Sequence, residues 1–138
     1  MAKCDLESMI KESVAVPMQA IATDTTTNSA AIDMQGYESL VLVAETGAWT
    51  DGTFTMALLE GDDTNISNAS AVADADLLPT GTGQEASAAL GAANSISKVG
   101  YRGTSRYVFV GLVSASTTTG ATVGVKAIQG HPANAPVA

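Results

Sequence analysis

Residues 99–113 read VGYRGTSRYVFVGLV and form the most strand-like run in the chain. From Tyr107 to Val113, apolar side chains fill both alternating sets of positions. Because successive side chains of a strand point to opposite faces, such a run predicts a strand that is covered on both faces. We therefore expect a central strand of a sandwich, or a strand held between a sheet and a partner subunit.

The composition is typical of a single β domain that works in an assembly. The chain has 138 residues, enough for one domain with a core, and only 4% of them are aromatic. Charged residues make up 14% of the chain, against about 25% in an average domain. A sparsely charged domain with many small residues usually hides surface in an assembly. The alternative is a β domain with a Thr-rich surface.

Charge and hydropathy exclude several classes of protein. The net charge of −8 argues against a nucleic-acid binder. No segment approaches the roughly 18 apolar residues of a membrane span, and the first residues lack the apolar core of a signal peptide. We therefore expect no nucleic-acid or membrane partner and no secretory signal. The only cysteine, Cys4, is either a free thiol or half of an intermolecular disulfide.

Turn signals divide the chain into seven or eight short antiparallel strands, which predicts an all-β fold. We expect a β-sandwich, jelly-roll or Ig-like. Pro17 should confine the first strand to an edge or a bulge. Residues 23–28 are expected to form a polar turn and residues 46–52 a loop. The expected strands are residues 14–22, 30–34, 40–44, 53–60, 95–101, 105–114 and 121–128.

We expect the chain to consist of an N-terminal arm at 1–13 and a β-sandwich domain at 14–138. In the arm, Leu6, Met9 and Ile10 have helical spacing, so it is either a short helix that orders against another surface or a frayed terminus. Residues 66–94 lose all periodicity and predict a long irregular excursion, with one short strand near 71–77 and a helical turn near 85–90. Residues 130–138 are expected to be an extended tail.

No constellation for catalysis is present in the sequence, so we expect a protein that is not an enzyme and uses no cofactor or metal. The only histidine, His131, lies in the tail and cannot complete an acid–base set. Residues 62–65 (DDTN) offer oxygens for Ca²⁺ but lack the Gly and terminal Glu of an EF-hand, which favours a plain turn. Trp49 is either an exposed anchor for a partner or a lid over one end of the sandwich.

Acidic and basic side chains are separated along the chain. Residues 14–97 hold eleven acids and no Lys or Arg, whereas residues 98–138 hold four bases and no acid. In a monomer the two parts interleave and pair locally. In an assembly, Arg102 and Arg106 would instead meet carboxylates of a neighbouring copy or of another surface. The sequence leaves both alternatives open, with Glu38 and Glu60 as candidate partners inside the domain.

Several segments resemble a family of small tailed-bacteriophage virion proteins encoded near the head genes. They keep the same order between about residues 30 and 138. The matching stretches are IDMQGYESL at 32–40, GAWTDGTFT at 47–55, LEGDD at 59–63, KVGYRG at 98–103, RYV at 106–108, the Thr-rich turn at 116–120, GHP at 130–132 and APV at 135–137.

This resemblance implies a capsid decoration (cement) protein on the outer surface of the virion, with the major capsid protein as its partner. The low charge content and the strand at 107–113, which is apolar on both faces, further predict a homo-oligomer. The expected stoichiometry is a trimer. The alternatives are a tail or head–tail junction component, and a virion carbohydrate-binding module that stacks sugars on Trp49, Tyr37 and Tyr101. The expected interface residues are Leu6, Met9, Ile10, Trp49, Arg102 and Arg106.

Overall fold

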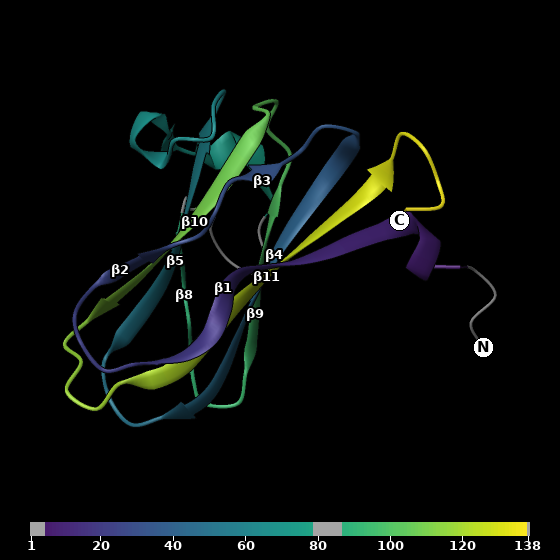
Figure 1. Ribbon diagram of the computed structural model, residues 1–138. Helices are drawn as coiled ribbons and strands as arrows, with labels where there is room; N and C mark the ends of the chain where they lie inside the picture. Colours follow the sequence, from purple (N-terminus) through teal and green to yellow (C-terminus); the bar gives the residue numbers. More distant parts are fainter. Residues whose placement is uncertain (1–4, 79–86, 138) are drawn as a thin grey trace.

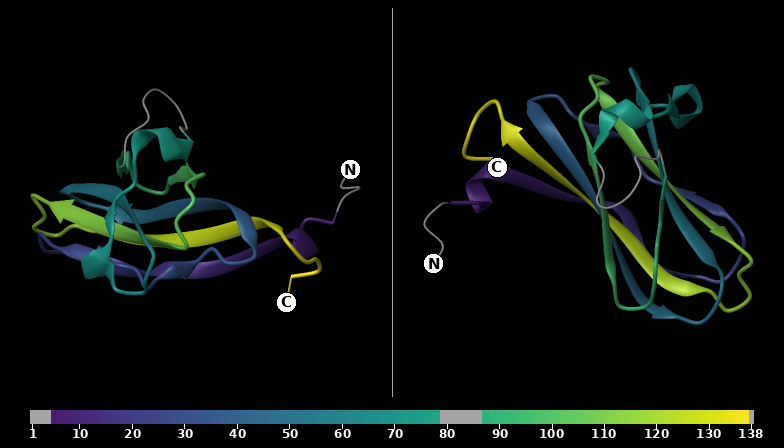
Figure 2. Two further views of the ribbon diagram at one scale, coloured as in Figure 1. Left: turned by 90° about the horizontal axis from the view of Figure 1, so that it is seen from above. Right: turned by 180° about the vertical axis from the view of Figure 1, so that it is seen from behind.

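The computed structural model describes residues 5–78 and 87–137 and is an all-β sandwich of two antiparallel sheets (Figures 1 and 2). The predicted fold class is thereby confirmed. Three short 3-10 turns accompany the strands: η1 (Glu7–Met9), η2 (Ile66–Asn68) and η3 (Asp74–Asp76). The strands are β1 (Ile10–Ile21), β2 (Thr26–Asn28), β3 (Ile32–Asp33), β4 (Tyr37–Trp49), β5 (Thr53–Gly61), β6 (Ser70–Ala71), β7 (Leu77–Leu78), β8 (Ser87–Ala89), β9 (Ile96–Tyr101), β10 (Tyr107–Ala115) and β11 (Ala121–Pro132).

The two sheets differ in the length of their strands. The first has the order β1-β11-β4-β9-β7, and its three longest strands, β1, β11 and β4, have 12, 12 and 13 residues. The second has the order β2-β10-β5-β6, with β3 also paired to β10 and β8 also paired to β5. The first sheet therefore has one long edge, β1, and one very short edge, β7.

Strand β10 lies in the middle of the second sheet, as residues 107–113 predict. It pairs with β5 on one side and with β2 and β3 on the other. Val108, Val110 and Leu112 belong to the core between the sheets and are fully buried. Phe109 points to the opposite side of the strand and is also buried, at 1% exposure. Both faces of this strand are thus covered over most of its length.

The core is filled by alternate residues of the long strands, because each strand presents every second side chain to the other sheet. Aliphatic side chains dominate it, as the low aromatic content predicts. Its fully buried members include Leu42 and Ala44 of β4, Phe54, Met56 and Leu58 of β5, and Val123, Val125 and Ala127 of β11.

Within the described residues 5–13 of the N-terminal arm, the last four residues belong to a strand, so of the two expectations for the arm the short helix is wrong. Only Glu7–Met9 form a 3-10 turn, and β1 begins at Ile10, where it pairs with Gly130. The ladder to β11 satisfies backbone groups along this segment, which an isolated helix of about eleven residues could not do stably. Pro17 lies within the register shift between Val16 and Gln19 of this edge strand, as predicted for an edge or a bulge.

Strands also extend beyond their predicted ends. β4 continues through Trp49 and pairs there with Ala121, so the predicted loop at 46–52 begins only after Trp49. β11 continues to Pro132, opposite Tyr37, so the first three residues of the predicted tail are strand. In both cases the ladder between β4 and β11 carries the pairing past polar and glycine positions.

The polar turn expected at 23–28 contains β2, which is held to β10 by buried hydroxyl groups. The Ser114 hydroxyl donates to the carbonyl of Thr23, at 2.7 Å, and accepts from the backbone N–H of Thr25, at 3.0 Å. Ser29 exchanges hydrogen bonds with the backbone of Val110. These contacts between distant segments, rather than local propensity, make a strand of a polar stretch.

The described parts of the excursion at 66–94 contain η2, β6, η3, β7 and β8. Its first part, with η2 and η3, lies at one end of the sandwich, whereas β8 runs along β5 towards the other end (Figure 1). The strand expected over 71–77 is wrong, because only residues 70–71 and 77–78 pair with other strands. The helical turn expected near 85–90 is also wrong over 87–89, which form β8; its first residues lie outside the described part.

Candidate docking surface

The outer face of the five-stranded sheet carries apolar side chains where polar ones are usual. An antiparallel sheet with one face in water normally alternates apolar inward residues with polar outward ones. Here Leu40, Leu42 and Ala44 point inward, and the residues between them, Val41 and Val43, point outward. The register places Val41 beside Ile128 of β11 and Gly100 of β9, so these outward positions form rows across the sheet.

Six aliphatic residues from five strands make up this surface, which we call the outer face. Three of them are well exposed: Val14 at 65%, Ile96 at 69% and Leu78 at 45%. The other three lie in the middle of the sheet and are partly exposed. Leu78 lies across Gly100, where an added Cβ would meet the Leu78 Cβ at 2.9 Å. The six residues are Val14, Val41, Val43, Leu78, Ile96 and Ile128.

Charged side chains of both signs border and cross the outer face. Lys126 and Glu45, on neighbouring strands, approach to 3.8 Å. Glu12 is paired with Ile128, and Lys98 with Val43, so both share the outward rows. The four charges sum to zero on a chain whose net charge is −8. The outer face is therefore both apolar and electrically balanced, whereas the chain as a whole is acidic.

A second apolar area lies on the N-terminal segment. Leu6 is 67% exposed and Met9 is 42% exposed, whereas Ile10 is only partly exposed because it belongs to β1. The backbone N–H of Val137 donates to the carbonyl of Ser8 at 3.0 Å, which fastens this segment to the C-terminal one. Both segments lie at the same end of the sandwich (Figure 2). Cys4 lies outside the described residues.

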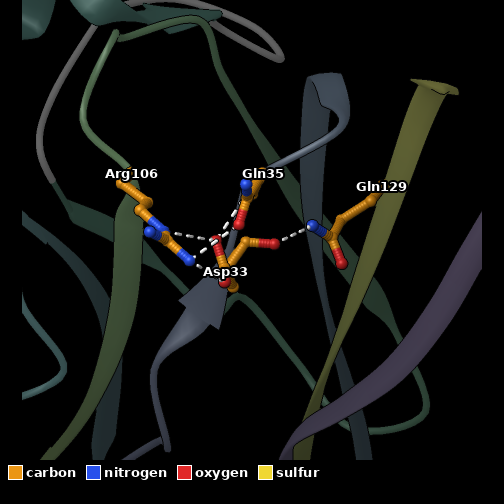
Figure 3. A network of polar contacts seen from close by, with 4 residues as sticks. All are labelled: Asp33, Gln35, Arg106 and Gln129. Carbon is orange, nitrogen blue, oxygen red and sulfur yellow. Dashed lines mark hydrogen bonds and ion pairs between the residues drawn. The ribbon is translucent and has the colours of Figure 1, made fainter. Parts of the chain in front are cut away.

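Arg106 is held by its own chain in a polar network beside β3 (Figure 3). Its Nε and Nη2 donate to the two carboxylate oxygens of Asp33 at 3.1 and 3.0 Å, and Nη2 also donates to Gln35 at 2.8 Å. On the other side, the buried amide of Gln129 donates to the Asp33 carbonyl at 2.8 Å. The Arg106 hydrogen bond, followed by one from the Gln35 backbone, holds the pKa of the Asp33 carboxyl below its usual value of 3.8.

Arg102 also binds within the chain, but to backbone. Its Nε donates to the Ala75 carbonyl at 2.9 Å, and its backbone N–H donates to the Asp76 carbonyl at 2.8 Å. Neither arginine pairs with Glu38 or Glu60, the candidates that the sequence suggested. Together with the pair of Lys126 and Glu45, these contacts agree with local interleaving of the two charge blocks.

We expect Arg106→Ala to lower the melting temperature of the domain by a few degrees at neutral pH, since the lost pair is exposed. A carboxyl with a depressed folded-state pKa adds stability above its unfolded pKa and loses it as the pH falls through the folded value. The difference between wild type and variant should therefore shrink below pH 3.8, the usual pKa of Asp33. Thermal unfolding followed by circular dichroism at several pH values measures this.

Arg102→Ala is the matched control, because its carbonyl partner does not titrate. Its effect on melting should not follow the Asp33 titration. Arginine variants that melt like wild type and weaken self-association instead would show that the network matters only between copies.

The three aromatic residues proposed as a sugar platform do not lie together. Trp49 and Tyr37 stand at opposite ends of β4. Trp49 packs edge-on against Phe54, with ring centroids 5.0 Å apart, which agrees with a lid over the core. Tyr37 and Tyr101 do line one hollow of about 460 Å³. Tyr101 is only 2% exposed, however, and burial, reinforced by a hydrogen bond to Glu60, raises its pKa to about 12.

The remaining candidate residues form ordinary structural contacts. Asp63 accepts from the backbone N–H of Asn65 and from the Asn68 side chain, both at 2.7 Å, as in a plain turn. Within residues 5–78 and 87–137, no three His, Cys, Asp or Glu side chains gather in a way that could hold a metal ion. His131 is exposed and shares a 2.8 Å hydrogen bond with Ser39. No helix in the described part is long and apolar enough to cross a membrane.

Comparisons with known proteins add little to the geometry. No family model matches the chain, and no curated protein matches it significantly. Among solved structures, the chain is similar to one from a study of Bacillus endospore appendages, described as a family of disulfide-linked pili. The two chains are 15% identical, with 94% of this chain and 96% of that chain covered and a TM-score of 0.46. A likeness at this level assigns no function to the present chain.

Proposed function

We propose that the protein is a non-enzymatic structural protein of a tailed-phage virion, a decoration protein that binds the outer shell of the head. Its partner in this proposal is the major capsid protein. The sequence resemblance over residues 30–138 supports the class of protein. The observation that carries docking is the exposure of Leu6 and Met9 on a segment anchored to the end of the sandwich.

Docking through this segment would stabilise the shell by mass action. A protein that binds the mature lattice better than other lattice states shifts the equilibrium towards the mature one. Burying the exposed parts of Leu6 and Met9 contributes roughly 3–5 kcal/mol before the cost of ordering the segment. Ile10 contributes less, because its backbone is already paired in β1 and its side chain is partly covered.

The double variant Leu6→Glu, Met9→Glu should lose binding to mature heads that lack the protein, measured by co-sedimentation. Both changes replace exposed apolar surface with charge, so the sandwich should keep its melting temperature. Val113→Glu is the matched control, because Val113 is 37% exposed on the other sheet. Unchanged co-sedimentation of the double variant would refute docking by this segment.

A truncation gives a second version of the same test, and the structure sets where it must stop. Deleting residues 2–13 would remove the first four residues of β1 and their pairs with β11. Deleting residues 2–9 leaves that ladder intact. The shorter deletion should abolish head binding while the domain still unfolds cooperatively.

A tail or head–tail junction component is the second candidate, since an exposed apolar segment could equally dock there. Incubation with purified tails in the same sedimentation assay separates the two. Binding to tails and not to heads would favour the junction. The carbohydrate-binding alternative has less support, because Trp49 and Tyr37 lie at opposite ends of β4.

A further inference from the structure

We propose that the outer face of the five-stranded sheet is a contact between two copies of this chain, packed face to face. The proposal does not depend on the phage assignment, because it concerns the folded chain alone. It starts from the six aliphatic residues that point outward in rows across the sheet, where an antiparallel sheet in water usually presents polar residues.

The size of the outer face suits a modest interface. Five strands spaced about 4.8 Å apart span about 24 Å, and three outward steps along β4 add about 20 Å in the other direction. Two copies would together bury about 1,000 Å², at the lower limit for a specific interface. We therefore expect association that depends on concentration, rather than a permanent complex.

The charges on the outer face favour a second copy. Most of the molecule is acidic, so two copies repel each other over most orientations. The outer face is the exception, because Lys98 and Lys126 balance Glu12 and Glu45 there. An apolar area with no net charge lets two copies approach without this repulsion.

The shape of the sheet also suits a self-contact. Two sheets of equal twist pack face to face with their strands about 30° apart, and a second copy brings the same twist automatically. The contact is then isologous, with the same patch on both copies. It predicts a dimer, or an assembly built from dimers, whereas the sequence led us to expect a trimer.

Sedimentation velocity of the purified chain over a wide concentration range tests this contact. Wild type should pass from monomer to dimer as concentration rises. Val43→Glu and Ile128→Glu each place a charge in the centre of the outer face and should weaken dimerisation by about tenfold or more. Their urea midpoints should stay close to wild type, since both side chains already point outward.

Val113→Glu is the matched control and should dimerise like wild type, because it lies on the second sheet. Three results would overturn the proposal. They are a wild-type chain that stays monomeric throughout, association that ignores Val43→Glu and Ile128→Glu, and a trimer that forms equally well in both variants. This assay does not involve head binding. Failure of the self-contact would therefore leave the decoration proposal standing, and failure of head binding would leave the self-contact proposal standing.

Discussion

Gly120→Ala should destabilise the domain by about 3 kcal/mol or more, the combined cost of backbone strain and overlap. Gly120 has φ +75°, and an added Cβ would overlap the carbonyl oxygen of Ile21. The backbone on both sides is fixed, because the Gly120 N–H donates to Asp51 at 2.7 Å and its carbonyl accepts from Thr50 at 2.9 Å. Urea unfolding followed by fluorescence measures the loss.

Two other glycines separate strain from overlap. Gly36 has φ +86° with nothing within 4 Å of an added Cβ, so Gly36→Ala should cost only about 1–2 kcal/mol. Gly91 has open space and no positive φ, so Gly91→Ala should be close to neutral or slightly stabilising. Equal losses for Gly120→Ala and Gly36→Ala would contradict the close approach of Ile21 to Gly120.

Phe54→Ala should cost about 3–5 kcal/mol, the usual range for removing a buried aromatic ring. Phe54 is 1% exposed, and its ring meets that of Trp49 at an interplanar angle of 76°. The change leaves a cavity between the sheets and removes the edge-on contact that holds Trp49 in place. The urea midpoint gives the stability, and Trp49 fluorescence reports the exposure of the indole.

Val113→Ala is the control for this core variant, since Val113 is 37% exposed. It should change stability by less than about 1 kcal/mol. A Phe54→Ala variant that unfolds at the wild-type midpoint with unshifted Trp49 emission would show that Trp49 does not rest on Phe54.

The long alternating strands could be predicted from sequence because their pattern reflects burial directly. Residues 53–60 alternate cleanly, and their apolar set, Phe54, Met56 and Leu58, is buried. Strand β10 was likewise expected at the centre of a sheet because both of its faces are apolar. In these strands the hydrophobic pattern and the tertiary environment agree.

Other elements depend on partners that are distant in sequence. Residues 26–28 become a strand because buried Ser29 and Ser114 hold this segment to β10. Leu6, Met9 and Ile10 have helical spacing, yet the strand that begins at Ile10 pairs with β11, more than a hundred residues later. Local propensity does not report such pairings, which is why strand ends and short edge strands were the main errors.

The docking surfaces were only partly predictable. Leu6 and Met9 were expected at an interface, and their exposure is compatible with that role, whereas Ile10 is partly covered and Trp49 packs on the core. The outer face was not predicted from the sequence, although the hydrophobic pattern of β4 indicates it. Residues 40–44 are apolar at every position, as residues 107–113 are. A strand with two apolar faces is expected to be covered on both of them.

An electron cryomicroscopy map of the virion tests the decoration proposal most directly. We expect density for this sandwich at regular lattice positions on the outer surface of the shell, with residues 6–9 against the major capsid protein. A shell with no such density, together with the sandwich in the tail or at the head–tail junction, would contradict it.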